Sequence, residues 1–198
     1  MKSPVKKHKG PVPKPANDNS NLRDRLHAAR IGWAETAFGA LGWGAAMALS
    51  TQAALWLSMA AITEHYWSLT ALTFGGAALA FPLSLMAFRF IAFKRSREVA
   101  FAAAFLCLTI FTIGVTSLVF AIIYRNFYAQ WHGDPFTRLW MYQLIFTAAS
   151  ALYQFAVIGV RFYLPLGVLF LFAASLMLAR SYGPRKPVKT GIIPNQTR

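Results

Sequence analysis

Two short loops of the sequence carry the side chains that are best suited to chemistry. Glu64 and His65 lie between the first two apolar segments, and His132 and Asp134 lie between the third and the fourth. Two imidazoles and two carboxylates on one side of a membrane could bind a divalent metal or shuttle a proton. Their spacing matches no metal motif, however, and loops that face water commonly carry such residues. We therefore expect neither a metal nor a catalytic site, and no cofactor.

Polar side chains also occur inside the apolar segments, where burial in hydrocarbon costs energy and often marks function. They can line the path of a small permease or channel, or they can form hydrogen bonds between helices, which is the more frequent use of such glutamines. No Asp, Glu, Lys or His lies in the central part of any segment, which disfavours ion-coupled transport and haem binding. The membrane polar residues are Gln52, Gln143, Gln154 and Arg161, with threonines at 109, 112 and 116.

The elements that would position these residues follow from the composition. The chain has 198 residues, of which 57% are hydrophobic and 13% charged, whereas soluble domains carry about 25% charged residues. A single cysteine, Cys107, excludes a disulfide scaffold. The apolar segments approach the roughly 20 residues that a membrane-spanning helix needs. The sequence therefore predicts an all-α polytopic membrane bundle of five transmembrane helices over 35–180, at 35–62, 67–93, 99–124, 139–160 and 162–180.

The distribution of basic residues predicts the orientation and leaves one conflict. Eight Lys or Arg residues precede the first segment of this chain of net charge +14, which places the N-terminus in the cytoplasm. Five crossings would then put the basic end of the chain, including Arg180, outside. If the last two segments together cross only once, the bundle has four spans and both ends lie inside. Both span counts remain open at this stage.

The regions outside the bundle are polar and basic. Residues 1–21 form a proline-rich tail and residues 181–198 a second basic tail, and both are expected to be disordered. Between them, residues 22–34 are expected to form a short amphipathic helix at the membrane interface, because Leu22, Leu26, Ala29 and Trp33 share one stripe. The alternative is an extension of the first span. A cleaved signal peptide is disfavoured, because the apolar stretch continues to Ile62.

Two further patterns predict contacts. Small residues at helical spacing let backbones approach closely in lipid, within the chain or with a partner. These helix-packing residues are Gly39, Ala46, Ser50 and Ala54 in the first segment and Gly76, Ala80 and Ser84 in the second.

A basic cluster can set topology or bind anionic lipid headgroups or a cytoplasmic partner, and any contact with nucleic acid would be unspecific. That cluster comprises Arg89, Lys94, Arg95 and Arg97.

These observations favour one function over two others. We expect a non-catalytic, multi-pass protein of the cell inner (cytoplasmic) membrane that is a subunit or assembly factor of a larger membrane protein complex. Its partners would be the lipid bilayer and other membrane proteins. The first alternative is a small permease or channel with a polar path lined by the glutamines and threonines. The second is a membrane-embedded enzyme that uses the histidine and carboxylate loops.

Overall fold

The computed structural model describes residues 18–58, 65–129 and 133–181, and every regular element among them is helical. Three helices are long and apolar enough to cross a membrane. They are α3 (Tyr66–Ala92), α4 (Arg97–Tyr128) and the stretch Arg138–Tyr163, which joins α5 (Arg138–Val157) to the short 3-10 helix η2 (Gly159–Tyr163). The expected all-helical membrane class is confirmed in this coarse form, whereas a bundle of five spans is not.

Two further apolar helices are not among these three, for different reasons. The helix α2 (Trp33–Leu57) has the length, but its glycines, tryptophans and Gln52 lower its mean hydropathy. The helix α6 (Leu166–Ser181) has 16 residues, a length of about 24 Å at 1.5 Å per residue. It begins later than the expected residue 162, because Leu164 has an extended backbone before Pro165 and a residue before proline disfavours the helical region.

The N-terminal helix differs from the expected interfacial helix over 22–34. The helix α1 (Asp18–Ala28) begins inside the expected tail and ends before a non-helical linker that leads to Trp33, the first residue of α2. The predicted apolar stripe is therefore divided between two helices, with Leu22 and Leu26 exposed and Ala29 buried. Residues 1–17 and 182–198, the remainder of the two expected tails, lie outside the described residues.

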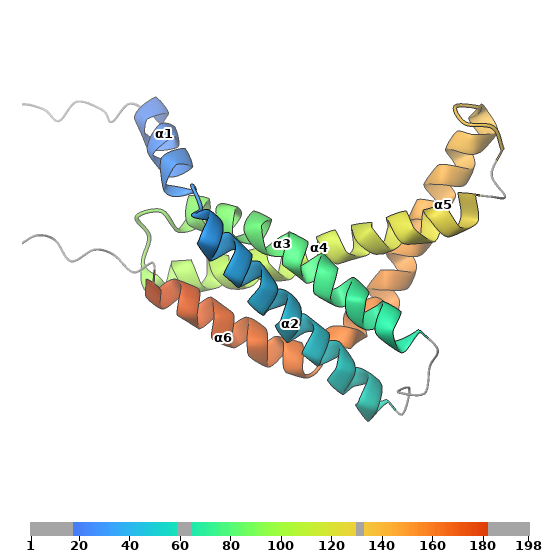
Figure 1. Ribbon diagram of the computed structural model, residues 1–198. Helices are drawn as coiled ribbons and strands as arrows, with labels where there is room; N and C mark the ends of the chain where they lie inside the picture. Colours follow the sequence, from blue (N-terminus) through green and yellow to red (C-terminus); the bar gives the residue numbers. More distant parts are fainter. Residues whose placement is uncertain (1–17, 59–64, 130–132, 182–198) are drawn as a thin grey trace, which may run out of the picture.

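The helices α2, α3 and α6 run in similar directions, α4 crosses this group at an angle and extends to the right, and there it meets α5, which leaves the group (Figure 1). The central helix α3 packs against α2 and α4, and α6 packs against α4 and α2. The start of α2, the connection between α3 and α4, and the end of α6, near which Arg30, Lys94 and Arg180 lie in the sequence, are all at the left of Figure 1. We call this the basic end. The end of α2 and the start of α3 lie at the lower right, and the end of α4 and the start of α5 lie at the upper right.

Small residues set how closely α3 approaches its neighbours. A side chain added at Gly76 would meet Thr116 of α4, with its Cβ 2.8 Å from the Thr116 Cα atom. A side chain added at Gly39 of α2 would collide with the ring of Phe81. Of the other predicted packing residues, Ala46 and Ala54 are partly buried, and those that are fully or almost fully buried are Ser50, Ala80 and Ser84. Gly76 thus lets the backbones of α3 and α4 approach closely, and Gly39 makes room on α2 for the Phe81 ring of α3.

Candidate functional site

Hydrogen bonds between buried side chains join α4 to two other helices. The Trp43 indole N–H of α2 donates to Thr112 Oγ1 at 2.9 Å. The Tyr163 hydroxyl of η2 donates to Thr116 Oγ1 at 2.9 Å. Both threonines of α4 are buried, so each bond satisfies a polar group that would otherwise be costly in a membrane. The channel alternative has these threonines lining a polar path, whereas the two observed bonds link helices.

Hydrogen bonds of buried hydroxyl groups also join α2 to α3 and to α6. Thr51 Oγ1 donates to Thr73 Oγ1 at 2.8 Å, and both side chains are fully buried. The backbone N–H of Gly167 donates to Ser50 Oγ at 2.8 Å, and the Ser50 hydroxyl donates to the Phe162 carbonyl oxygen at 3.3 Å. An N–H in the first turn of a helix has no partner within that helix. Ser50 of α2 therefore caps α6 from another helix.

A cavity of about 440 Å³ lies between α3, α4 and the junction of α5 with η2. Its polar lining consists of His65, Ser68 and Gln154, and aromatic rings form much of the remainder. Gln154 Nε2 also donates to the Tyr124 hydroxyl over a long distance of 3.4 Å. The cavity offers a few hydrogen-bonding side chains beside apolar walls, a composition that is typical of sites for small molecules. The aromatic lining residues are Phe120, Phe155 and Phe162.

The other predicted membrane polar residues lie apart from this cavity. Gln143 Oε1 accepts the Gly133 backbone N–H at 2.9 Å and so fixes the start of α5. Gln52 is partly buried on α2 and does not line the cavity, and the side chain of Arg161 is exposed in η2. The permease alternative requires the three glutamines to converge on one path, and in the structure they do not.

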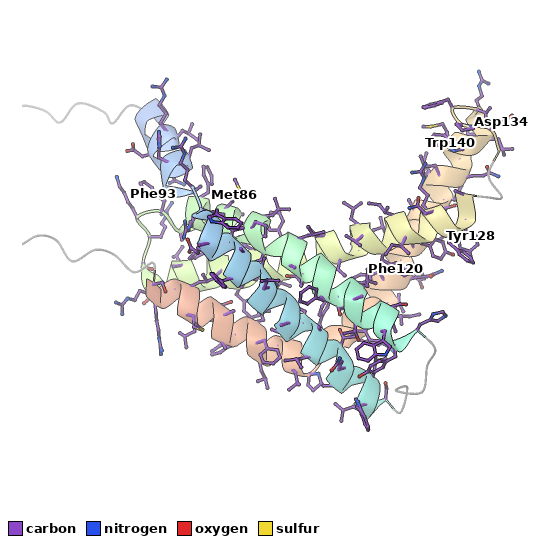
Figure 2. The ribbon with its side chains drawn as sticks, viewed as in Figure 1. Met86, Phe93, Phe120, Tyr128, Asp134 and Trp140 are labelled. Atoms are coloured by element: carbon purple, nitrogen blue, oxygen red, sulfur yellow. The ribbon has the colours of Figure 1, made fainter. Side chains whose placement is uncertain are left out.

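The structure does not bring His65 and Asp134 together. His65 lines the cavity beside η2, whereas Asp134 precedes α5, and the intervening helix of 20 residues is about 30 Å long. Figure 2 shows Asp134 at the tip of α5 and Phe120 near the other end of that helix. Glu64 and His132 lie outside the described residues. Among those that are described, no three His, Cys, Asp or Glu side chains are grouped as a metal site would require.

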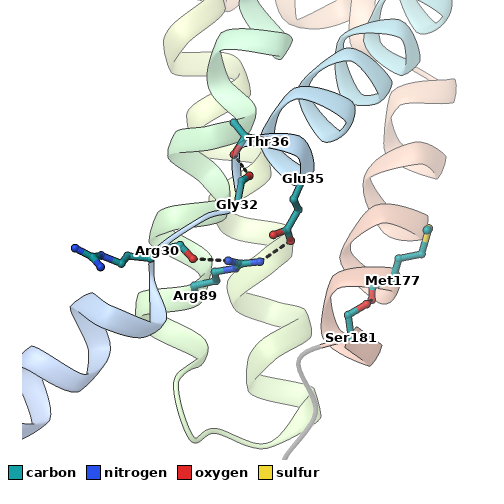
Figure 3. A network of polar contacts seen from close by, with 7 residues as sticks. All are labelled: Arg30, Gly32, Glu35, Thr36, Arg89, Met177 and Ser181. Atoms are coloured by element: carbon teal, nitrogen blue, oxygen red, sulfur yellow. Dashed lines mark hydrogen bonds and ion pairs between the residues drawn. The ribbon is translucent and has the colours of Figure 1, made fainter.

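At the basic end, Arg89 ties the start of α2 to α3 (Figure 3). Its guanidinium forms an ion pair with Glu35 and donates to the Arg30 carbonyl oxygen at 2.7 Å. The Arg89 side chain is only 16% exposed, so it is engaged within the protein. The three other residues of the predicted basic cluster, Lys94, Arg95 and Arg97, are exposed. The cluster thus divides into one structural arginine and three charges that face outward.

We predict that Arg89→Gln loosens the linker between α1 and α2. Because Arg89 holds the Arg30 carbonyl, its loss should weaken this contact by about 1 kcal/mol, so that local opening rises about fivefold. The measurement is the rate of trypsin cleavage after Arg30 in the detergent-solubilised protein. Lys94→Gln is the charge-matched control and should leave the rate unchanged. An unchanged rate for Arg89→Gln would contradict the assigned contact.

Comparison of the chain with protein-family models, curated proteins and solved structures found no match. Three structural features bear on the function: the paired polar groups, the cavity between α3 and α5, and the exposed surfaces of the helices.

Proposed function

We propose that this chain is a non-catalytic, multi-pass protein of the cytoplasmic membrane that serves as a subunit or assembly factor of a larger membrane protein complex. The proposal rests mainly on how much of the α5 surface is left exposed by the rest of the chain. Only 17% of the most apolar stretch of the α5 span is buried within the chain, against 39% for α3. The buried hydrogen bonds Trp43–Thr112, Thr51–Thr73 and Tyr163–Thr116 support it too, because these polar groups already stabilise the bundle.

The exposed face of α5 has a composition suited to a protein partner. Tyr142, Phe146 and Tyr153 are 64–70% exposed, and their spacing places them on one side of the helix. Aromatic residues are enriched at protein interfaces, and a tyrosine hydroxyl removed from water needs a hydrogen-bond partner. Lipid tails cannot supply one, whereas a polar group on a neighbouring membrane protein can. We call these three residues the aromatic face of α5.

A photo-crosslinking amino acid at position 153 tests this function in intact membranes. We expect a discrete adduct of one protein species, and the same adduct from position 142. Leu79 of α3 is an exposed apolar control outside the aromatic face, and the crosslinker at that position should give no such band. Equal labelling from positions 79 and 153, or no protein adduct from the aromatic face, would contradict the proposal.

We further propose four crossings, with α5, η2 and α6 together forming the last one. The support is geometric: α6 ends at the basic end, where α2 begins, and α5 leaves the bundle at an angle (Figure 1). A straight helix over this stretch would be about twice the hydrocarbon thickness. With one oblique crossing, Arg180 joins the other basic residues on one side, which satisfies the charge rule that five crossings violate.

The predicted topology is measured by fusing reporters to the protein. Green fluorescent protein should fluoresce at both the N-terminus and the C-terminus, because it folds in the cytoplasm. Alkaline phosphatase should be active when fused at Gly133, which lies between α4 and α5, and inactive at the C-terminus. An active phosphatase at the C-terminus would instead establish five crossings.

A further inference from the structure

A second cavity, of about 390 Å³, lies at the basic end between the first turns of α4 and the last turns of α6. Each helix contributes an arginine near its end and an apolar side chain one turn deeper. On α4 these are Arg97 and Phe101, and on α6 they are Arg180 and Leu176. Residues four positions apart are neighbours on a helix surface. The cavity therefore has a cationic rim and an apolar floor.

We propose that this cavity binds the phosphate group of an anionic phospholipid, with an acyl chain against the apolar floor. Guanidinium groups bind phosphate oxygens through paired, charge-assisted hydrogen bonds, and the two arginines reach the rim from different helices. The ring of Phe101 also packs against Phe172 at 5.3 Å between centroids. The apolar surface thus continues along α6 beyond the cavity, in the direction that a lipid tail would follow.

The first turn of α4 adds to the positive character of the rim. Ser96, the residue before the helix, makes no side-chain hydrogen bond to the first turn. The first backbone N–H groups of a helix lack partners within it, and they favour an anion at that end. A phosphate held by Arg97 would lie beside these groups. The helix end thus reinforces a site that the two arginines define.

The charge balance selects a lipid phosphodiester over free phosphate. Glu98 also lines the cavity, so two cationic groups and one carboxylate leave a net charge of +1. A phosphodiester such as that of phosphatidylglycerol carries one negative charge, whereas phosphate monoesters carry about 1.5 to 2 at neutral pH and free phosphate carries between one and two. A single negative charge with an attached acyl chain therefore complements both the rim and the floor. The sequence pattern pointed to Arg97 but not to Arg180, because the two lie far apart in the chain.

Native mass spectrometry of the full-length protein in detergent tests this site. The protein is titrated with phosphatidylglycerol and, in a second arm, with phosphatidylcholine that carries the same acyl chains. We expect one phosphatidylglycerol to bind preferentially. Arg97→Gln and Arg180→Gln should each weaken that binding about fivefold, and the double variant about 25-fold. The variant Lys94→Gln/Arg95→Gln removes the same charge from exposed residues that do not line the cavity, and it should retain the lipid.

Three results would overturn the proposal. Equal loss of lipid in the Lys94→Gln/Arg95→Gln control would show that general surface charge accounts for the binding. Equal retention of phosphatidylcholine would show that the arginines do not select the headgroup. Displacement of the lipid by millimolar inorganic phosphate would assign the rim to free anions. Unchanged melting temperatures of the arginine variants would show that loss of lipid is not loss of fold.

Discussion

The variant Gly76→Ala should lose about 1–3 kcal/mol of folding free energy, the usual cost of overpacking a close contact. Its new methyl group would collide with Thr116 of α4, and the collision includes the Thr116 backbone. Rotation of a side chain cannot relieve a backbone contact, so α3 and α4 must separate. That separation also shifts Thr116, which accepts the Tyr163 hydrogen bond. The measurement is the midpoint of unfolding in detergent micelles.

The preceding residue provides the matched control. An added Cβ at Gly75 would meet no atom within 4 Å. Gly75→Ala should therefore leave the unfolding midpoint unchanged or raise it slightly. Within a helix, alanine is more favourable than glycine by about 1 kcal/mol. If the two variants had the same midpoint, the close approach of α3 and α4 at Gly76 would be wrong.

The second large effect is expected from Ser50→Ala. The variant removes the acceptor of the Gly167 N–H and the donor to the Phe162 carbonyl oxygen. A buried polar group left without a partner costs about 1–3 kcal/mol, and the first turn of α6 has no internal substitute. We expect a lower unfolding midpoint and faster hydrogen exchange at the start of α6.

Ser117→Ala is the control that shows what the loss of a hydroxyl group costs when the group does not link two helices. The Ser117 hydroxyl donates to the Gly114 carbonyl oxygen within its own helix and in an exposed position. This replacement should change the midpoint by no more than about 0.5 kcal/mol, as is usual at such surfaces. Equal destabilisation by the two alanine variants would contradict the assignment of Ser50 as a cap between helices.

The central helices could be predicted from the sequence because their apolar runs are long. The run expected over 67–93 corresponds to α3 (Tyr66–Ala92), and the run over 99–124 corresponds to α4 (Arg97–Tyr128). Helix ends were predicted less well, because polar residues can continue a helix that hydropathy alone would end. The break expected between residues 160 and 162 is longer in the structure, where η2 and the extended Leu164 separate α5 from α6.

The partners of polar side chains could not be predicted from spacing. Gln143 resembled a membrane residue, yet it holds the loop before α5. Ser50 was identified through its small size, whereas its hydroxyl caps a helix more than one hundred residues away in the chain. Such pairings depend on how the helices cross, which helical periodicity does not encode. Each residue type indicated a polar role, and only the packing identified its partner.

The bond between Ser50 and Gly167 joins α2 to α6, a helix that is synthesised more than one hundred residues later. Proteins fold progressively during translation, but this bond cannot form until α6 has left the ribosome. The early helices must therefore wait in the membrane with the Ser50 site unfilled. A nascent chain truncated before α6 would keep that polar site open, and quality-control proteases could distinguish it from the finished protein.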